Sequence, residues 1–108
     1  MSIPTEIFEE IDRSLKADPA RAAGTDASYV FDLSGDDGGL YHIVLRDGAG
    51  SAGAGGVEGA GVTISMAAAD FVDMRHGRLD PTMAFMSGKI KISGDMGLAM
   101  KLQSVLRQ

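Results

Sequence analysis

The chain has 108 residues, 44% of them apolar and 23% charged, which is enough for one hydrophobic core and predicts a single domain over residues 1–108. It contains no cysteine, so disulfides, thiolate chemistry and zinc–cysteine sites are excluded. Its formal net charge of −5 disfavours nucleic acid as a partner, because an acidic protein repels phosphate groups at long range.

The first half of the chain predicts one helix followed by a β-hairpin. Apolar residues recur at helical spacing over residues 4–16, and glutamates stand near the start, where the helix dipole favours them. A short second helical turn is expected near residues 19–23. Residues 28–33 and 40–45 have the apolar character of strands, and the Gly- and Asp-rich residues 35–39 between them predict a tight turn.

Residues 48–61 are rich in glycine, with seven Gly and four Ala among fourteen residues. This composition predicts a pliable hairpin or loop, with at best a weak edge strand around Val57. Residues 48–53 match the dinucleotide pattern GxGxxG, but the glycines that follow cannot form the helix that would bind a pyrophosphate, so a turn is favoured. The acidic residues 32–37 resemble the start of a calcium loop, yet a hairpin turn explains them better.

The second half predicts two short strands and three helices. The strands are expected over residues 62–66 and 89–93, and the helices over residues 67–76, 82–87 and 96–106. Gly77 and Gly88 end the first two helices, and an Asp-Pro pair starts the second. In the strand over 89–93, the two isoleucines are expected to point inward and the lysines outward. The last helix is apolar over a wider arc than one stripe needs, so we expect it to contact apolar material on two sides.

Methionine is the compositional feature that calls for an explanation. The chain has seven methionines, against four phenylalanines and two tyrosines, and six of the seven lie within residues 66–108. One interpretation is a Met-rich core, because Met at helical spacing usually packs. The other is a deformable apolar cavity, which the wide apolar arc of the last helix and the scarcity of rings favour.

No catalytic or metal-binding arrangement stands out. His42 falls on a predicted strand and His76 in the last turn of a predicted helix, where a structural role is the ordinary explanation. Sequence motifs for a nucleophilic serine, a zinc protease or a phosphate-binding loop do not occur. We therefore expect no enzymatic activity, no metal and no cofactor.

The second half also carries motifs with a specific resemblance. The run from Gly88 to Gln103, GKIKISGDMGLAMKLQ, together with Val62–Met66, Asp70-Phe71 and Gly77–Pro81, resembles the sterol carrier protein type 2 family. The resemblance implies an α/β (α+β) domain, in which a five-stranded, mostly antiparallel sheet is covered on one face by about five helices and encloses an apolar tunnel. It also implies a stand-alone, single-domain member of that family.

The resemblance implies a function as well. Members bind or transfer sterols, fatty acids, fatty acyl-CoA and phospholipids, so a hydrophobic small molecule is the expected partner. The last helix forms part of the tunnel wall in several members, and Gln103 is the expected polar contact. The residues that we expect to line the tunnel are Phe71, Met74, Phe85, Met86, Ile90, Ile92, Met96, Met100 and Gln103.

Further expectations concern the location of the protein, its contact with membranes and an alternative function. The N-terminal residues show no continuous apolar stretch, so neither a signal peptide nor a membrane span is expected, and a cytoplasmic monomer with at most transient membrane contact follows. The first helix is acidic, which disfavours membrane docking through it. The alternative function is an accessory or protein-interaction domain with a closed structural core and no physiological lipid ligand.

Overall fold

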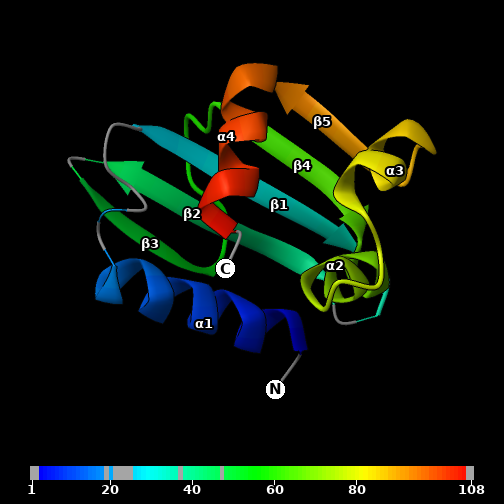
Figure 1. Ribbon diagram of the computed structural model, residues 1–108, viewed down its shortest axis with the longest axis horizontal. Coiled ribbons are helices and arrows are strands. Elements are labelled where there is room, and N and C mark those ends of the chain that lie inside the picture. The colour runs from blue at the N-terminus through cyan, green and yellow to red at the C-terminus, as the bar shows by residue number, and fades with distance from the viewer. Residues whose placement is uncertain (1–2, 19, 21–25, 37, 47, 107–108) are drawn as a thin grey trace.

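The computed structural model describes residues 3–18, 20, 26–36, 38–46 and 48–106, with side chains from residue 4 to residue 102. These residues form one five-stranded sheet and four helices (Figure 1). The elements in chain order are α1 (Ile3–Ala17), β1 (Ala27–Ser34), β2 (Gly39–Arg46), β3 (Ala49–Ala54), β4 (Val62–Ala67), α2 (Ala68–Arg75), α3 (Pro81–Met86), β5 (Ile90–Gly94) and α4 (Met96–Leu106). Most of the short turn expected at residues 19–23 lies outside the described residues, so the fifth helix is not confirmed.

The sheet is mixed, which corrects the expectation of a mostly antiparallel one. Its strand order is β3-β2-β1-β4-β5, and β1 pairs antiparallel with β2 but parallel with β4. The parallel pair arises because residues 55–61 do not turn tightly after β3. They carry the chain past β2 and β1, and Val62 enters the sheet beside Tyr29, near the start of β1. β4 therefore runs in the same direction as β1.

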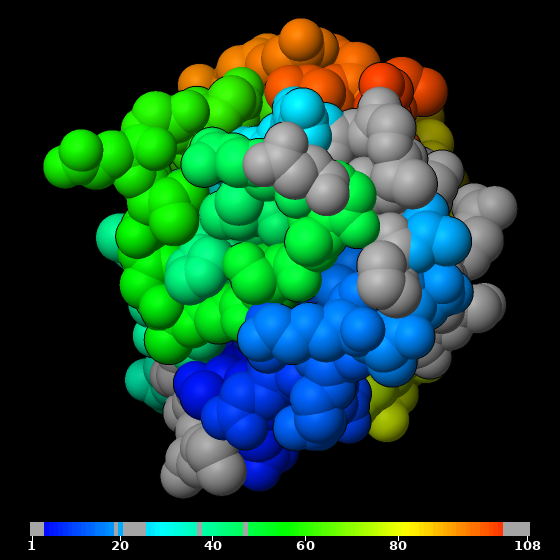
Figure 2. Space-filling view, turned by 90° about the vertical axis from the view of Figure 1, so that its left-hand side faces the viewer, coloured from blue at the N-terminus to red at the C-terminus, as the bar shows by residue number. Residues whose placement is uncertain are grey.

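The glycine-rich segment contains a regular strand, so the predicted loop is wrong over Ala49–Ala54. β3 pairs with β2 along its whole length, whereas Val57 lies outside any strand. Small residues are required here because α1 lies directly against this strand, as Figure 2 shows. A side chain at Gly50 would bring its Cβ to 3.0 Å from Leu15 Cδ1 of α1. The composition that suggested a loop thus allows a close approach of helix and strand.

A polar contact fixes α1 on this edge of the sheet. The backbone N–H of Ala52 donates to Asp12 Oδ1 at 3.0 Å, and Lys16 Nζ donates to Asp12 Oδ2 at 2.8 Å. Burial raises the pKa of Asp12, but these hydrogen bonds and the lysine charge outweigh it, so the pKa lies below its usual 3.8. The carboxylate therefore stays ionised and holds the helix against β3.

The core lies between one face of the sheet and the helices. The strand predictions are confirmed there, because Tyr29, Phe31 and Leu33 alternate along β1 and are at most 3% exposed. Phe8 of α1 stacks on Phe71 of α2 with ring centroids 5.1 Å apart, and Phe31 meets Phe71 edge-on at 5.7 Å. Four of the six aromatic rings of the chain, those of Phe8, Phe31, Tyr41 and Phe71, thus form one cluster in the core beside α1 and α2.

Candidate ligand cavity

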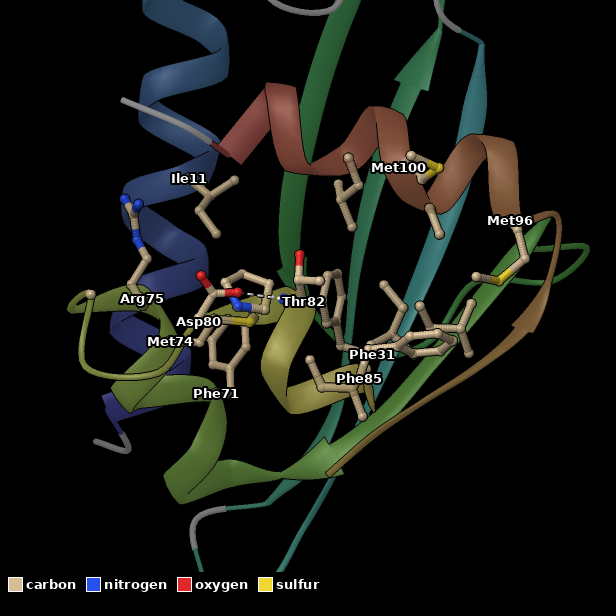
Figure 3. A pocket seen from close by; sticks show the side chains of 17 residues that line it. Ile11, Phe31, Phe71, Met74, Arg75, Asp80, Thr82, Phe85, Met96 and Met100 are labelled. Carbon is tan, nitrogen blue, oxygen red and sulfur yellow. Dashed lines mark hydrogen bonds between the residues drawn. The ribbon is translucent and has the colours of Figure 1, made fainter. Parts of the chain in front are cut away.

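A cavity of about 670 Å³ lies between the sheet and helices α2, α3 and α4 (Figure 3). Its walls are mainly apolar, and the polar side chains that line it are Arg75, Asp80 and Thr82. The residues that line it are Ile11, Phe31, Ile64, Phe71, Met74, Arg75, Gly77, Asp80, Pro81, Thr82, Phe85, Ile90, Ile92, Met96, Ala99, Met100 and Leu102.

The cavity has a buried floor and a more exposed opening. Phe31 and Phe71 at its floor are 1% exposed, and they belong to the ring cluster of the core. Phe85 and Met96 at the other end are 43% and 44% exposed, and Met100 is 70% exposed. Because these three side chains line the cavity and also reach solvent, the cavity opens between α3 and α4. It is an open pocket, and a closed tunnel is not confirmed.

Local interactions set the positions of the two helices at the opening. Asp80 begins α3 by accepting hydrogen bonds from the backbone N–H groups of Thr82 at 2.8 Å and Met83 at 3.2 Å. Gly88 follows the helix with a φ of 82°, a conformation that favours glycine. Asp95 begins α4 in the same way, accepting from the N–H of Gly97 at 2.8 Å.

A buried tyrosine ties α4 to the sheet. Tyr29 is 0% exposed, and its hydroxyl donates to the carbonyl oxygen of Leu98 at 2.7 Å. Burial, and to a lesser extent the negative charge of Asp95, raises the pKa of Tyr29 above 10.0. The phenol is therefore neutral at physiological pH and remains a hydrogen-bond donor that holds α4 over the cavity.

The structure brings together seven of the nine residues expected to line a tunnel, namely Phe71, Met74, Phe85, Ile90, Ile92, Met96 and Met100. Met86 is placed differently, because its side chain is 79% exposed and does not line the cavity. Gln103 lies on α4, and its side chain is outside the described residues.

Sequence reasoning missed most of the inner wall and the polar side. Phe31 and Ile64 pair across β1 and β4 and face the cavity together, a position that depends on strand order and not on periodicity. Ala99 and Leu102 supply the inner face of α4, as the i, i+3 spacing could have shown. Arg75, which Figure 3 shows at one side of the cavity, ends α2 and could have been marked by its position before Gly77.

The two histidines do not line the cavity. His42 lies on β2, with Nδ1 3.0 Å from the carbonyl oxygen of Gly55, and His76 is the C-cap of α2; neither lines the cavity. Among the described residues, no group of His, Asp or Glu side chains is arranged to hold a metal ion. None of the helices in the described residues has both the length and the apolar character needed to cross a membrane.

Comparison with known proteins gives this cavity a context. A model of the SCP-2 sterol transfer family matches residues 8–107. Hydroxysteroid dehydrogenase-like protein 2 of Homo sapiens is 46% identical over 104 residues, which cover 95% of this chain and 24% of that protein. The protein of the same name from Danio rerio is 47% identical over 89 residues, covering 82% of this chain and 21% of its own length. This chain therefore spans about a quarter of the length of these curated relatives.

Solved structures share the fold over nearly the whole chain. The sterol carrier protein domain 2 of Helicoverpa armigera is 34% identical with a TM-score of 0.78, covering 95% of this chain and 84% of its own. Palmitated SCP2L2 of Aedes aegypti is 25% identical with a TM-score of 0.79, covering 100% of this chain and 96% of its own. The resemblance drawn from the run Gly88–Gln103 is confirmed, and the chain belongs to the SCP-2 sterol transfer family.

Proposed function

We propose that this chain binds one hydrophobic ligand, such as a sterol, a fatty acid or a fatty acyl-CoA, in the cavity, without chemistry, and transfers it between membranes. The observation that carries the proposal is the cavity itself. Its volume of about 670 Å³ lies within the range of roughly 300–1,000 Å³ that is usual for small-molecule sites. It is lined mainly by apolar side chains and opens to solvent between α3 and α4.

Apolar burial alone gives a useful affinity in such a site. Burying about 14 methylene groups of palmitate at ~0.8 kcal/mol each contributes about 11 kcal/mol. The cost of immobilising the ligand reduces this gain, and a dissociation constant in the micromolar range is expected. Neither a metal nor a covalent bond is needed for binding of this strength.

The methionines of the cavity wall suit ligands of different shapes. Met74, Met96 and Met100 have unbranched side chains that can repack around a straight chain or a ring system. Palmitate is a suitable first probe, since the SCP2L2 structure is described as palmitated. We propose that Arg75 or Gln103 contacts the polar end of the ligand, because Arg75 is a cation in the cavity wall and Gln103 is the polar contact that the resemblance to the sterol carrier family implies.

A charged group at the opening tests the binding site. We expect Met100→Asp and Phe85→Asp to abolish uptake of a fluorescent fatty acid, because each places a carboxylate in the apolar wall. Both side chains are at least 43% exposed in the wild type, so the folded state should tolerate the change. Leu40→Asp is the matched control, since Leu40 is 50% exposed and does not line the cavity. Unchanged uptake by folded Met100→Asp and Phe85→Asp would contradict the proposal.

The second candidate function is an accessory domain whose interior has no physiological ligand. It is favoured by one finding, namely that the matched relatives are about four times longer than this chain. Binding without turnover, the cytoplasmic location and the monomeric state remain predictions. Turnover is tested by incubating the purified chain with an acyl-CoA, the monomeric state by sedimentation, and the location by cell fractionation. An empty chain that does not respond to palmitate would favour the accessory role.

A further inference from the structure

Exposed apolar side chains gather around the opening of the cavity. Six large apolar side chains of the described residues are exposed, and five of them belong to α3 and α4. They are Met83 (67%), Phe85 (43%) and Met86 (79%) on α3, and Met96 (44%) and Met100 (70%) on α4. We call these five residues, with Lys89 beside them, the rim face.

Helix α3 is the most prominent part of the rim face. Ala84 is its only buried residue, so the helix projects from the molecule instead of filling the core. Figure 1 shows α3 at the margin of the fold beside the start of β5, away from most of α1. Met83 and Met86 do not line the cavity, so ligand binding does not account for their exposure. A short helix with two methionines in water has unused apolar area that a partner can cover.

Basic residues outnumber acids around α3, while Asp95 begins α4 on the other side of the rim face. Residues 75–91 contain Arg75, Arg78, Lys89 and Lys91 but only one acid, Asp80, whose carboxylate caps α3. Arg78 is paired with Asp73 at 3.5 Å. The other three cations have no ion pair within 4.0 Å among the described residues. Lys89 is joined to α3 through its backbone N–H, which donates to the carbonyl oxygen of Ala84 at 2.9 Å.

Helix α1 has the opposite charge. Helix α1 carries four acids, Glu6, Glu9, Glu10 and Asp12, and only two bases, Arg13 and Lys16. An anionic surface would repel α1 and attract the region around Lys89, and so would orient the molecule with the rim face toward it.

We propose that the rim face docks on an anionic phospholipid bilayer and places the opening of the cavity against the lipid. This rests on the proposed function, because docking here would let a ligand pass between bilayer and cavity without crossing water. Met83, Phe85 and Met86 enter the interface between headgroups and acyl chains, as the apolar faces of interfacial helices do. Lys89, which is joined to α3, contacts the anionic headgroups.

The test is flotation of the full chain with vesicles of equal parts phosphatidylcholine and phosphatidylserine. The double variant Met83→Asp/Met86→Asp is expected to bind about tenfold more weakly than the wild type. Leu40→Asp, a matched change of the sixth exposed apolar residue, is expected to bind within about twofold of it. Circular dichroism spectra establish that each variant is folded.

A second pair of variants tests the charge. Lys89→Glu is expected to weaken binding to the anionic vesicles about fivefold, as loss of one basic contact predicts. Arg46→Glu, an exposed position at the far end of β2, serves as the control and should have a smaller effect. Vesicles of phosphatidylcholine alone should bind the wild type more weakly and should not distinguish Lys89→Glu from it.

Palmitate binding separates this proposal from the proposed function. The Met83→Asp/Met86→Asp variant is expected to bind soluble palmitate as the wild type does, because neither residue lines the cavity. Equal vesicle binding by this variant and the wild type, or no vesicle binding by the wild type at low salt, would overturn membrane docking even if palmitate binds. A dimer in sedimentation that the double variant dissociates would also overturn it, because a second copy of the chain would then cover the rim face.

Discussion

Filling the cavity from α4 tests whether ligand and side chains compete for the same space. Ala99 lines the cavity from the inner face of α4 and is 8% exposed. In Ala99→Phe, the ring would occupy volume otherwise available to about four methylene groups of a ligand. At ~0.8 kcal/mol per methylene, the lost burial is about 3 kcal/mol, or roughly a 100-fold weaker affinity for palmitate. A ligand that shifts toward the opening would recover part of this, so the expected loss is between about tenfold and 100-fold.

The same substitution has the opposite expected effect on stability. A ring in an apolar void gains contacts and leaves water, so the free energy of unfolding should stay level or rise without ligand. Displacement of a fluorescent fatty acid by palmitate gives the affinity, and thermal unfolding followed by circular dichroism gives the stability. Ala69→Phe on α2 is the control, because Ala69 is exposed and does not line the cavity. An unchanged palmitate affinity in folded Ala99→Phe would refute the placement of the ligand.

Three further substitutions test the contacts that shape the site, each by urea unfolding. Asp12→Ala should lower the free energy of unfolding by about 1–2 kcal/mol, because it removes the acceptor that holds α1 against β3. Since folding lowers the pKa of Asp12 below 3.8, this difference in stability should be complete above about pH 5 and should shrink as the pH falls through the lower, folded-state pKa. A difference that does not depend on pH would contradict the role given to the Asp12 carboxylate. Tyr29→Phe should lower the free energy of unfolding by about 1 kcal/mol and increase amide hydrogen exchange in α4, since the Tyr29 hydroxyl ties α4 to β1. Unchanged exchange in α4 would contradict this role of the hydroxyl. Gly94→Ala should destabilise by more than about 2 kcal/mol, because φ is 113° and a Cβ would clash with the carbonyl oxygen of Gly61, whereas Gly77→Ala, with open space around it, should cost less.

The parts of the fold that periodicity controls could be predicted from the sequence. Alternation along β1 and helical spacing in α1 placed both elements to within one residue of their ends. β3 could not be predicted in this way, because its alanines and glycines have low strand propensity and are explained only by the closeness of α1. The direction of β4 could not be predicted either, since the alternation of apolar residues along a strand does not show which neighbour the strand pairs with.

The cavity wall was predicted in part for a similar reason. Met96 and Met100 stand four residues apart on α4, and both reach the cavity as the wide apolar arc suggested. Met86 lies on a helix of six residues, too short for periodicity to decide which side faces inward. The two interpretations of the methionines were therefore both incomplete. Met66 is core at 4% exposure, three methionines line the cavity, and Met83 and Met86 point into solvent beside it.

Native mass spectrometry of the delipidated chain, titrated with palmitate, tests the central claim most directly. One cavity of about 670 Å³ predicts a complex with one palmitate per chain, which Phe85→Asp fails to form and Leu40→Asp forms as the wild type does. A chain that remains bare with excess palmitate, or that takes up palmitate equally in Phe85→Asp, would contradict a lipid-binding cavity.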